Sequence, residues 1–269
     1  DYSVGNIVLW SEVFNTEYTI AEDMLIIGFV RGNQFNFAFP MGGGDLKAAF
    51  EWILKYCEKK NMKFSMHAVE PEMYEKVEEL FPGKFKITYI RDYADYVYRV
   101  SDLRDLAGKK YSAKRNHIHK FLRTYDNWAY ETITDENTPE CIEMVKQWCI
   151  KNNCSDEKVL KDEVCILIKG LKNRKELNLV GGLIRADGRV VAMTLGEKSD
   201  DEMFIVHFEK AFTDVPGAYT MINREFVSHE LTGFKYVNRE EDLGLEGLRK
   251  AKESYHPDFM VQKGVLTLK

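Results

Sequence analysis

The sequence contains no long apolar run and no closely spaced cysteine pair. Its hydrophobic stretches, such as residues 24–30, are far shorter than the roughly 20 residues that a membrane-spanning helix requires. The five cysteines include no CxxC pair, and their odd number leaves one unpaired, which is typical of reduced thiols in a reducing compartment. No basic-then-apolar leader occurs at the start. We therefore predict a cytoplasmic chain without a transmembrane segment, with small buried cysteines and no structural zinc site.

Motifs for a protein nucleophile or a phosphate loop are also missing. There is no Ser/His/Asp order and no HExxH, and the three glycines at residues 42–44 are not followed by Gly-Lys-Ser/Thr. Acyl transfer from an activated ester needs no such motif, because positioning, an amide aimed at the developing oxyanion and the removal of one proton suffice. The sequence gives no support to these hydrolase classes and stays compatible with acyl transfer.

Acidic residues are absent between Asp105 and Asp126, although the whole chain has a formal charge of −5. The cations of this basic stretch are Lys109, Lys110, Lys114, Arg115, Lys120 and Arg123. A basic stretch of this kind can be the solvated face of a helix between two domains. In an acidic chain, cations without a compensating acid favour an anionic partner, and phosphate contacts would make its binding steeply salt-dependent.

Taken as a helix from Tyr111 onward, the basic stretch has one apolar side. That side consists of Tyr111, Ile118, Leu122 and Tyr125, and the opposite side of Lys109, Asn116, Lys120 and Arg123. Lys114 and Arg115 flank the apolar side and can reach along the edge of a groove. We expect residues 108–126 to form a bridging helix between two domains.

Strand-like and helical patterns alternate along the rest of the chain. Helices are expected over residues 6–14, 46–60, 71–81, 138–152, 156–171, 217–231 and 245–255, and strands over 16–40 (three runs), 63–69, 85–90, 92–100, 127–134, 176–212 (three runs), 234–240 and 258–268. Both halves repeat the order meander, helix, strand, helix, strand. This order predicts an α+β fold with a mostly antiparallel mixed sheet in each half, the first domain spanning residues 1–107 and the second 127–269.

That order resembles the GNAT acyltransferase fold, and two copies in one chain resemble the tandem-GNAT enzymes. Three motifs are similar to the family of the C-terminal catalytic domain of phosphatidylglycerol lysyltransferases: GKKYSAKRNHIHKF (108–121), VHFEKAFTDVPGAYTMINREF (206–226) and KYVNREEDLGLEGLRKAKESYHP (235–257). The resemblance covers nearly the entire chain. It implies two tandem GNAT-like domains, with the active site in the second.

The resemblance also implies an activity. Characterised members of the family take an aminoacyl group from charged tRNA, so we expect an aminoacyl-tRNA donor, tRNA contact through residues 108–123, and a small acceptor with an amine or hydroxyl group. The single glycine of TDVPGAYT, Gly217, stands where acyl-CoA enzymes have a Gly-rich pyrophosphate loop. Two alternatives stay open: an acyl-CoA-dependent N-acyltransferase, and a catalytically silent tandem-GNAT module that binds RNA or a protein. No firm cofactor and no metal are predicted.

The candidate catalytic residues are His207, Glu209 and Tyr255. His207 and Glu209 lie two residues apart on an expected strand, so they point to one face, where they could bind an ammonium group or shuttle a proton. An exposed pair on an edge strand explains them equally well. Tyr255, just before His256 and Pro257, could supply a proton to a leaving group, or it could pack as a structural residue.

The candidate substrate-binding residues are Asn223, Arg239, Glu240 and Asp242. Asn223 lies on the expected helix 217–231, and the other three belong to NREEDLG (238–244), directly after an expected buried strand. The family resemblance favours this segment as the place where an amino-acid-like group binds, with the carboxylates holding its ammonium. The same segment could instead be a polar turn in which Asp242 caps the helix 245–255. The six cations of the basic stretch are the candidates for binding RNA or another anion.

Overall fold

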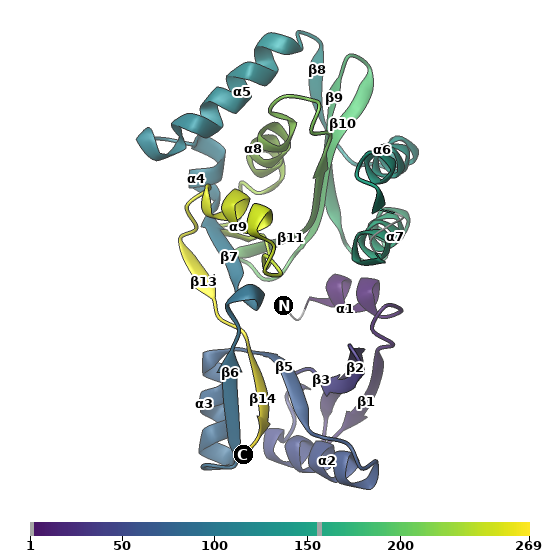
Figure 1. Ribbon diagram of the computed structural model, residues 1–269, viewed down its shortest axis with the longest axis vertical. Coiled ribbons are helices and arrows are strands. Elements are labelled where there is room, and N and C mark those ends of the chain that lie inside the picture. Colours follow the sequence, from purple (N-terminus) through teal and green to yellow (C-terminus); the bar gives the residue numbers. More distant parts are fainter. Residues whose placement is uncertain (1–2, 155–157) are drawn as a thin grey trace.

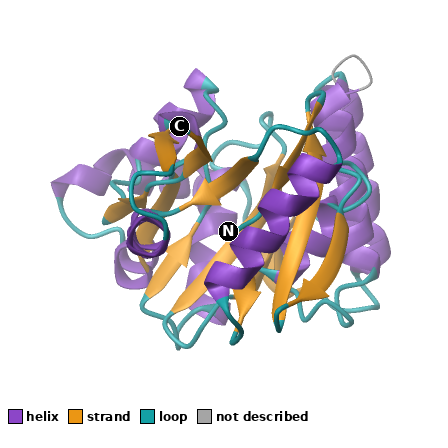
Figure 2. Ribbon diagram, turned by 90° about the horizontal axis from the view of Figure 1, so that it is seen from below, coloured by secondary structure: helices purple, strands orange, loops and turns teal. Residues whose placement is uncertain are grey.

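The computed structural model describes residues 3–154 and 158–269, in which two mixed β-sheets are flanked by helices (Figure 1). The view from below shows helices covering the strands on both sides (Figure 2). This arrangement confirms the expected α+β class, with one mixed sheet in each half. The expected helix 156–171 is α7 (Lys158–Lys172), and residues 156–157 of that expectation lie outside the described residues. Within the described ranges, no helix combines the length and apolar character that crossing a membrane requires.

The first sheet has the strand order β1-β2-β3-β5-β14-β6, with β4 paired to β2. Its strands are β1 (Glu17–Ala21), β2 (Met24–Arg31), β3 (Gln34–Phe37), β4 (Met41–Gly42), β5 (Ser65–Val69), β6 (Phe85–Tyr89) and β14 (Gly264–Leu268). Two helices, α2 (Leu46–Lys59) and α3 (Pro71–Leu80), belong to this half. The helical stripe of α2 buries Phe50 and Ile53 in the first core, and Asp45 caps its start by accepting a hydrogen bond from the Ala48 N–H at 3.0 Å.

The second sheet has the strand order β13-β7-β12-β11-β10-β9-β8. Its strands are β7 (Asp95–Arg99), β8 (Trp128–Thr132), β9 (Val180–Ala186), β10 (Arg189–Lys198), β11 (Met203–Ala211), β12 (Tyr236–Asn238) and β13 (Phe259–Val261). Asp187 and Gly188 form the turn that joins β9 to β10, with φ angles of 48° and 78°, a left-handed conformation that suits these two residues.

Helices cover both faces of the second sheet (Figure 1). α6 (Thr138–Lys151) and α7 lie on one face, and α8 (Ala218–Glu230) lies on the other with α4 (Val100–Asp105) and α5 (Ser112–Thr124) packed against it. α9 (Glu246–Glu253) follows β12, and two short 3₁₀ helices, η1 (Arg91–Tyr93) and η2 (Lys109–Tyr111), flank β7 and α4. α1 (Val4–Trp10) packs on α7, so Leu9, near the start of the chain, is buried in the second core.

Each half contains one strand from the other end of the chain. In the first half, β14 lies antiparallel between β5 and β6, and in the second half β7 lies antiparallel between β12 and β13. The strand on one side of the inserted strand is β5 in the first half and β12 in the second. Each of them pairs in parallel with the strand on its other side, β5 with β3 and β12 with β11. The halves therefore share one topology and exchange the equivalent strand.

This exchange differs from the sequence expectation at two places. Residues 258–268 were expected as one strand but form β13 and β14, which lie in different sheets. The chain crosses between the sheets at Lys263, whose ammonium is buried and contacts a carboxylate oxygen of Asp95 at 2.6 Å. The two sheets also do not coincide with the expected domains, residues 1–107 and 127–269. β7 lies within the first range but belongs to the second sheet, and β14 lies within the second range but belongs to the first sheet.

The basic stretch forms η2 and α5, as expected from its periodicity. Tyr111 and Ile118 are buried in the second core, together with Phe121, which the expected stripe did not include. Lys109, Asn116, Lys120 and Arg123 are exposed, as predicted. α5 packs on α8 rather than between the two cores, so it connects the halves in sequence and belongs to the second half in space (Figure 1).

The cysteines are free thiols, and Cys57, Cys141 and Cys154 are buried, as predicted. Cys149 is half-buried. Cys165 is exposed, so the expectation was wrong for this residue. It lies on the side of α7 that faces α1, where it lines a pocket of about 450 Å³.

Gly217 is expected to tolerate no side chain. Its φ angle is +81°, and a Cβ added there would lie 2.2 Å from the carbonyl oxygen of His117 on α5. We expect Gly217→Ala to lower the free energy of unfolding by about 1–3 kcal/mol, because it combines backbone strain with overpacking. Urea denaturation of this variant measures the loss, and Gly188→Ala, which is also left-handed but open to solvent, is the control that isolates strain from packing. Equal losses for the two variants would contradict the packing argument.

Candidate active site

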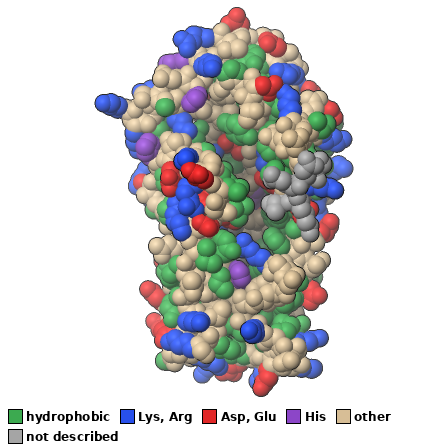
Figure 3. Space-filling model, in the orientation of Figure 1, with side chains coloured by type: hydrophobic (Ala, Val, Ile, Leu, Met, Phe, Trp, Pro, Cys, Tyr) green, Lys and Arg blue, Asp and Glu red, His purple; other side chains and the backbone are tan. Residues whose placement is uncertain are grey.

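The second sheet opens where β12 ends. β11 and β12 pair only from Met203 to Ile205, and β11 then continues to Ala211 with β10 as its partner. Side chains of β11 beyond Ile205 therefore face the residues that follow β12 instead of a paired strand. The molecular surface is hollowed in this region, between α9 and the helices α6 and α7 (Figure 3).

His207 lies at this opening between two carboxylates. Its Nδ1 is 2.8 Å from Glu240 Oε1, its Nε2 is 2.9 Å from Glu197 Oε1, and its side chain is 2% exposed. Burial alone lowers the pKa of His207, but the charge of Glu240 and the hydrogen bonds to both carboxylates outweigh it and raise the pKa to about 9. His207 is therefore an imidazolium at neutral pH and donates hydrogen bonds to both glutamates.

The start of α1 closes one side of this cluster. The Gly5 N–H donates to Glu197 Oε2 at 3.3 Å, and Asn6 Nδ2 donates to Glu240 Oε1 at 3.2 Å. A Cβ at Gly5 would lie 2.5 Å from Glu197 Oε1, so a side chain here would displace this carboxylate from its place beside His207. The first helix thus fixes both carboxylates that hold His207.

Glu209, two residues further along β11, holds a second cluster. Its Oε1 accepts from Arg239 Nη2 at 2.8 Å, and its Oε2 accepts from Asn223 Nδ2 at 3.3 Å. Arg239 Nη1 and Asn223 Oδ1 are buried without a hydrogen-bond partner among the described residues. Because buried polar atoms are almost always satisfied, this donor and this acceptor are positions where a substrate can bind.

Two aromatic rings and a lysine complete this part of the site. The Arg239 guanidinium lies 5.7 Å from the ring centre of Tyr98 and 5.0 Å from that of Tyr255. Lys114 reaches over from α5 and places its Nζ 3.6 Å from the centre of the same Tyr255 ring. Burial raises the pKa of the Tyr255 hydroxyl to about 12.

Comparison with known proteins shows which family this chain belongs to. Residues 1–263 match the family described as phosphatidylglycerol lysyltransferase, C-terminal. The chain belongs to this family. A conserved protein of unknown function from Bacteroides thetaiotaomicron VPI-5482 has a similar structure, with a TM-score of 0.93 and 40% identity over 99% of this chain and 90% of that chain.

Two further relatives of this lysyltransferase-like family are more distant. The C-terminal domain of a putative lysylphosphatidylglycerol synthetase from Agrobacterium fabrum shares the fold, with a TM-score of 0.70 and 12% identity over 98% of this chain and 87% of that chain. An uncharacterised protein of Mycoplasmoides gallisepticum is 24% identical over 190 residues, which are 69% of this chain and 60% of that protein. The matched part is therefore less than two thirds of that relative.

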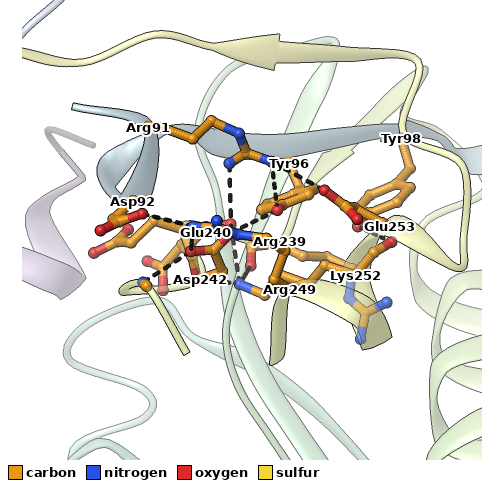
Figure 4. Close-up of polar contacts among 12 residues, drawn as sticks. Arg91, Asp92, Tyr96, Tyr98, Arg239, Glu240, Asp242, Arg249, Lys252 and Glu253 are labelled. Carbon is orange, nitrogen blue, oxygen red and sulfur yellow. Dashed lines mark hydrogen bonds and ion pairs between the residues drawn. The ribbon is translucent and has the colours of Figure 1, made fainter. Parts of the chain in front are cut away.

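Asp242, one of the predicted substrate-binding residues of this family member, is not brought to the opening (Figure 4). It is fully buried, and its carboxylate accepts from Arg249 at 2.8 and 2.9 Å, from the Tyr96 hydroxyl at 2.6 Å and from the Gly244 N–H at 2.9 Å. The hydrogen bonds from Arg249, supported by those from Tyr96 and the Gly244 N–H, hold the pKa of Asp242 well below its usual range, although burial alone would raise it. Asp242 thus stabilises the polar loop after β12, but it does not cap α9 as the polar-turn interpretation expected, because the N-cap residue is Leu245 and no side chain of the described residues caps this helix.

The six cations of the basic stretch divide into three groups. Arg115 Nη1 donates to the carbonyl oxygens of Leu106 and Gly108, which fixes the turn before η2. Lys110 pairs with Asp102 at 3.3 Å, and Lys114 points to the site. The remaining three are exposed and have no side-chain partner in the part of the chain that the structure describes: Lys109, Lys120 and Arg123.

Sequence reasoning did not find Glu197 or Lys252. Glu197 lies one residue before the end of the apolar strand β10, and a lone carboxylate in such a strand was the available signal. The Lys252 ammonium donates to the carbonyl oxygens of Arg239, Glu240 and Glu241, so it holds the loop that positions the two predicted residues (Figure 4). Burial and the charge of Arg239 lower the pKa of Lys252 to about 8.

Proposed function

We propose that this chain transfers an aminoacyl group from aminoacyl-tRNA to an acceptor with an amine or hydroxyl group. Membership of the lysyltransferase C-terminal family, together with the GNAT-like fold, implies an acyl or aminoacyl transferase. The donor, the acceptor and the residues that contact them are the parts that we propose.

The start of α8 is the observation that favours aminoacyl-tRNA over acyl-CoA as the donor. Acyl-CoA enzymes of this fold hold the pyrophosphate with backbone amides of a Gly-rich loop at a helix N-terminus. Here the loop has one glycine, and α5 packs against it so closely that the His117 carbonyl oxygen lies 2.2 Å from the Cβ position of Gly217. A carbonyl oxygen and a packed helix at this point disfavour a pyrophosphate.

The cluster around Glu209 suits an aminoacyl ester. Asn223 Oδ1 can accept a hydrogen bond from an α-ammonium group, while Arg239 Nη1 can donate to the ester carbonyl and to the oxyanion that develops from it. The Glu209 carboxylate between them adds a negative charge that favours the ammonium. An acyl chain without an amino group would leave the buried Asn223 oxygen unpaired, which costs binding free energy.

Removal of the three exposed cations of α5 and η2 is expected to weaken tRNA binding. In the combined variant Lys109→Ala, Lys120→Ala and Arg123→Ala, we expect tRNA affinity to fall by about tenfold or more at low salt. The slope of log affinity against log salt should become shallower by about 2–3, because each phosphate contact contributes about one unit. Filter binding of aminoacylated tRNA at several salt concentrations measures both quantities.

A matched control removes three exposed lysines from α2 in the other half: Lys47, Lys55 and Lys59. This control should leave the affinity and the salt slope unchanged. Transfer itself is followed with tRNA that carries a radiolabelled amino acid, using phosphatidylglycerol vesicles and a short peptide amine as separate acceptors. No tRNA binding at low salt, with thermal stabilisation by acetyl-CoA, would overturn the proposal in favour of acyl-CoA chemistry. Binding without transfer to either acceptor would indicate a binding module.

A further inference from the structure

Lys114 differs from the other cations of the basic stretch in its direction. Instead of pointing to solvent, its side chain crosses from α5 to the segment after α9, where Nζ lies 2.6 Å from Ser254 Oγ and over the Tyr255 ring. The Tyr255 ring also contacts the Arg239 guanidinium at 5.0 Å. Lys114 and Arg239 therefore contact the same aromatic ring, and Arg239 in turn pairs with Glu209.

The surroundings of Lys114 favour a neutral amine more than is usual for lysine. The charged and titratable groups that face it are Arg239, Glu209 and Tyr255. Burial and the charge of Arg239 lower the pKa of Lys114 to about 8, against the smaller opposite effect of Glu209. At pH 7 about a tenth of this amine is therefore neutral and can accept a proton, far more than for an ordinary lysine.

The hydrogen bonds of Lys114 leave its lone pair available. Ser254 Oγ donates its own proton to the Ala251 carbonyl oxygen at 2.6 Å, so it can only accept from Lys114. A neutral Nζ has two N–H bonds, one for Ser254 and one for the face of the Tyr255 ring. Among the described residues Nζ has no third partner, so the remaining position on nitrogen can take up a proton from a substrate.

The other titratable groups of the site do not have this freedom. His207 is already an imidazolium between two carboxylates, and Glu209 is paired with Arg239. Lys252 is buried and directs its ammonium at three backbone carbonyl oxygens. The Tyr255 hydroxyl stays protonated because its pKa is about 12.

From this geometry we infer that Lys114 is the catalytic base that takes the proton from the acceptor, an inference that rests on the proposed aminoacyl transfer. The acceptor nitrogen or oxygen attacks the ester carbonyl carbon and forms the new C–N or C–O bond, while its proton passes to Nζ of Lys114. As the bond between the carbonyl carbon and the ribose oxygen breaks, Nζ returns the proton to that oxygen. The step needs no oxidant, reductant or further reactant.

The test compares Lys114→Met and Lys114→Arg with wild-type protein in single-turnover transfer from aminoacyl-tRNA between pH 6 and pH 9.5. Positioned general bases contribute about 10²–10⁴-fold, so both variants should lose about 10²-fold or more in rate. Arginine keeps the charge but does not deprotonate, so Lys114→Arg should bind tRNA as wild-type protein does and still fail to transfer. The wild-type rate should rise with pH up to about 8, and this rise should be absent from both variants.

Lys146→Met, on an exposed position of α6, is the control for removal of a lysine and should leave the rate and its pH dependence unchanged. Wild-type rate in Lys114→Arg would overturn the inference, because the charge alone would then suffice. A loss confined to tRNA affinity in Lys114→Met would overturn it as well.

A second measurement does not depend on the donor. In protein labelled with ¹³C at lysine Cε, the NMR resonance that disappears in Lys114→Arg should titrate near pH 8. Titration near the ordinary lysine pKa of about 10.4 would overturn the inference whatever the activity. If Lys114 titrates near 8 but no aminoacyl group is transferred, the proposed donor fails, and the same variants are compared with acetyl-CoA as the donor. Equal rates in that comparison would overturn the role of Lys114 too.

Discussion

Asp242→Asn is expected to lower the free energy of unfolding by about 3–5 kcal/mol, the usual cost of removing one partner of a buried ion pair. The carboxylate is 0% exposed and accepts hydrogen bonds from Arg249, Tyr96 and the Gly244 N–H. An amide keeps the shape, but it offers only one oxygen, presents its NH₂ group to donors, and leaves Arg249 with the more exposed Asp92 as its counter-charge. Urea denaturation at pH 7 with several structural probes measures the loss.

The control is Asp258→Asn. Asp258 pairs with Arg99 at 3.0 Å, but both side chains are substantially exposed, so the cost should stay below about 1 kcal/mol. The Asp242 contribution should also depend on pH. Its pKa is lowered in the folded state, so the stabilisation is present above the unfolded pKa of about 3.9 and is lost as the pH falls below it. Equal losses in the two variants, or no difference in acid sensitivity between Asp242→Asn and wild-type protein, would contradict this account.

His207→Gln is expected to remove a stabilisation that depends on pH in the opposite direction. The folded-state pKa of His207 is raised from 6.5 to about 9, so its contribution is complete below pH 6.5 and is lost as the pH rises to about 9. The shift corresponds to about 3 kcal/mol, at 1.36 kcal/mol per pKa unit. Glutamine can still hydrogen-bond to both Glu197 and Glu240, but it carries no charge to hold them together. The measurement is the free energy of unfolding of both proteins at pH 6, 7.5 and 9.5.

The difference between wild-type protein and His207→Gln is the informative quantity. Lys114 and Lys252 have lowered pKa values, so their own contributions grow as the pH rises from about 8 toward the ordinary lysine value of about 10.4 and oppose the trend from His207. These contributions cancel in the difference because both proteins contain them. A difference that is the same at pH 6 and pH 9.5 would show that His207 is not charged in the folded protein.

Local patterns were sufficient to predict most elements of the fold. The period of 3.6 residues located α2 and the buried side of α5. The exchange of β7 and β14 was not predicted. A short apolar strand has the same pattern whichever sheet it joins, and the partner is decided by contacts such as that of Lys263 with Asp95, 168 residues away.

The candidate site was predicted in part, for a similar reason. The spacing of His207 and Glu209 placed them correctly on one face of β11, and the charged segment after β12 brings Arg239 and Glu240 to them. The backbone of the loop after β12 decides which of its carboxylates faces His207. Glu240 has a φ angle of 56° and contacts His207, whereas Asp242 points away to Arg249. The direction of Lys114 likewise depends on where the segment after α9 lies in space.

The exchanged strands also determine when this protein can finish folding. During synthesis most of the first sheet is made early, but the position between β5 and the edge strand β6 stays empty until residues 264–268 have left the ribosome. β7 is complete more than 100 residues before its neighbour β12, and its hydrogen-bonding groups have no partner strand during that time. The two halves therefore cannot fold one after the other from the N-terminus, because both sheets become complete only when β13 and β14 have been synthesised.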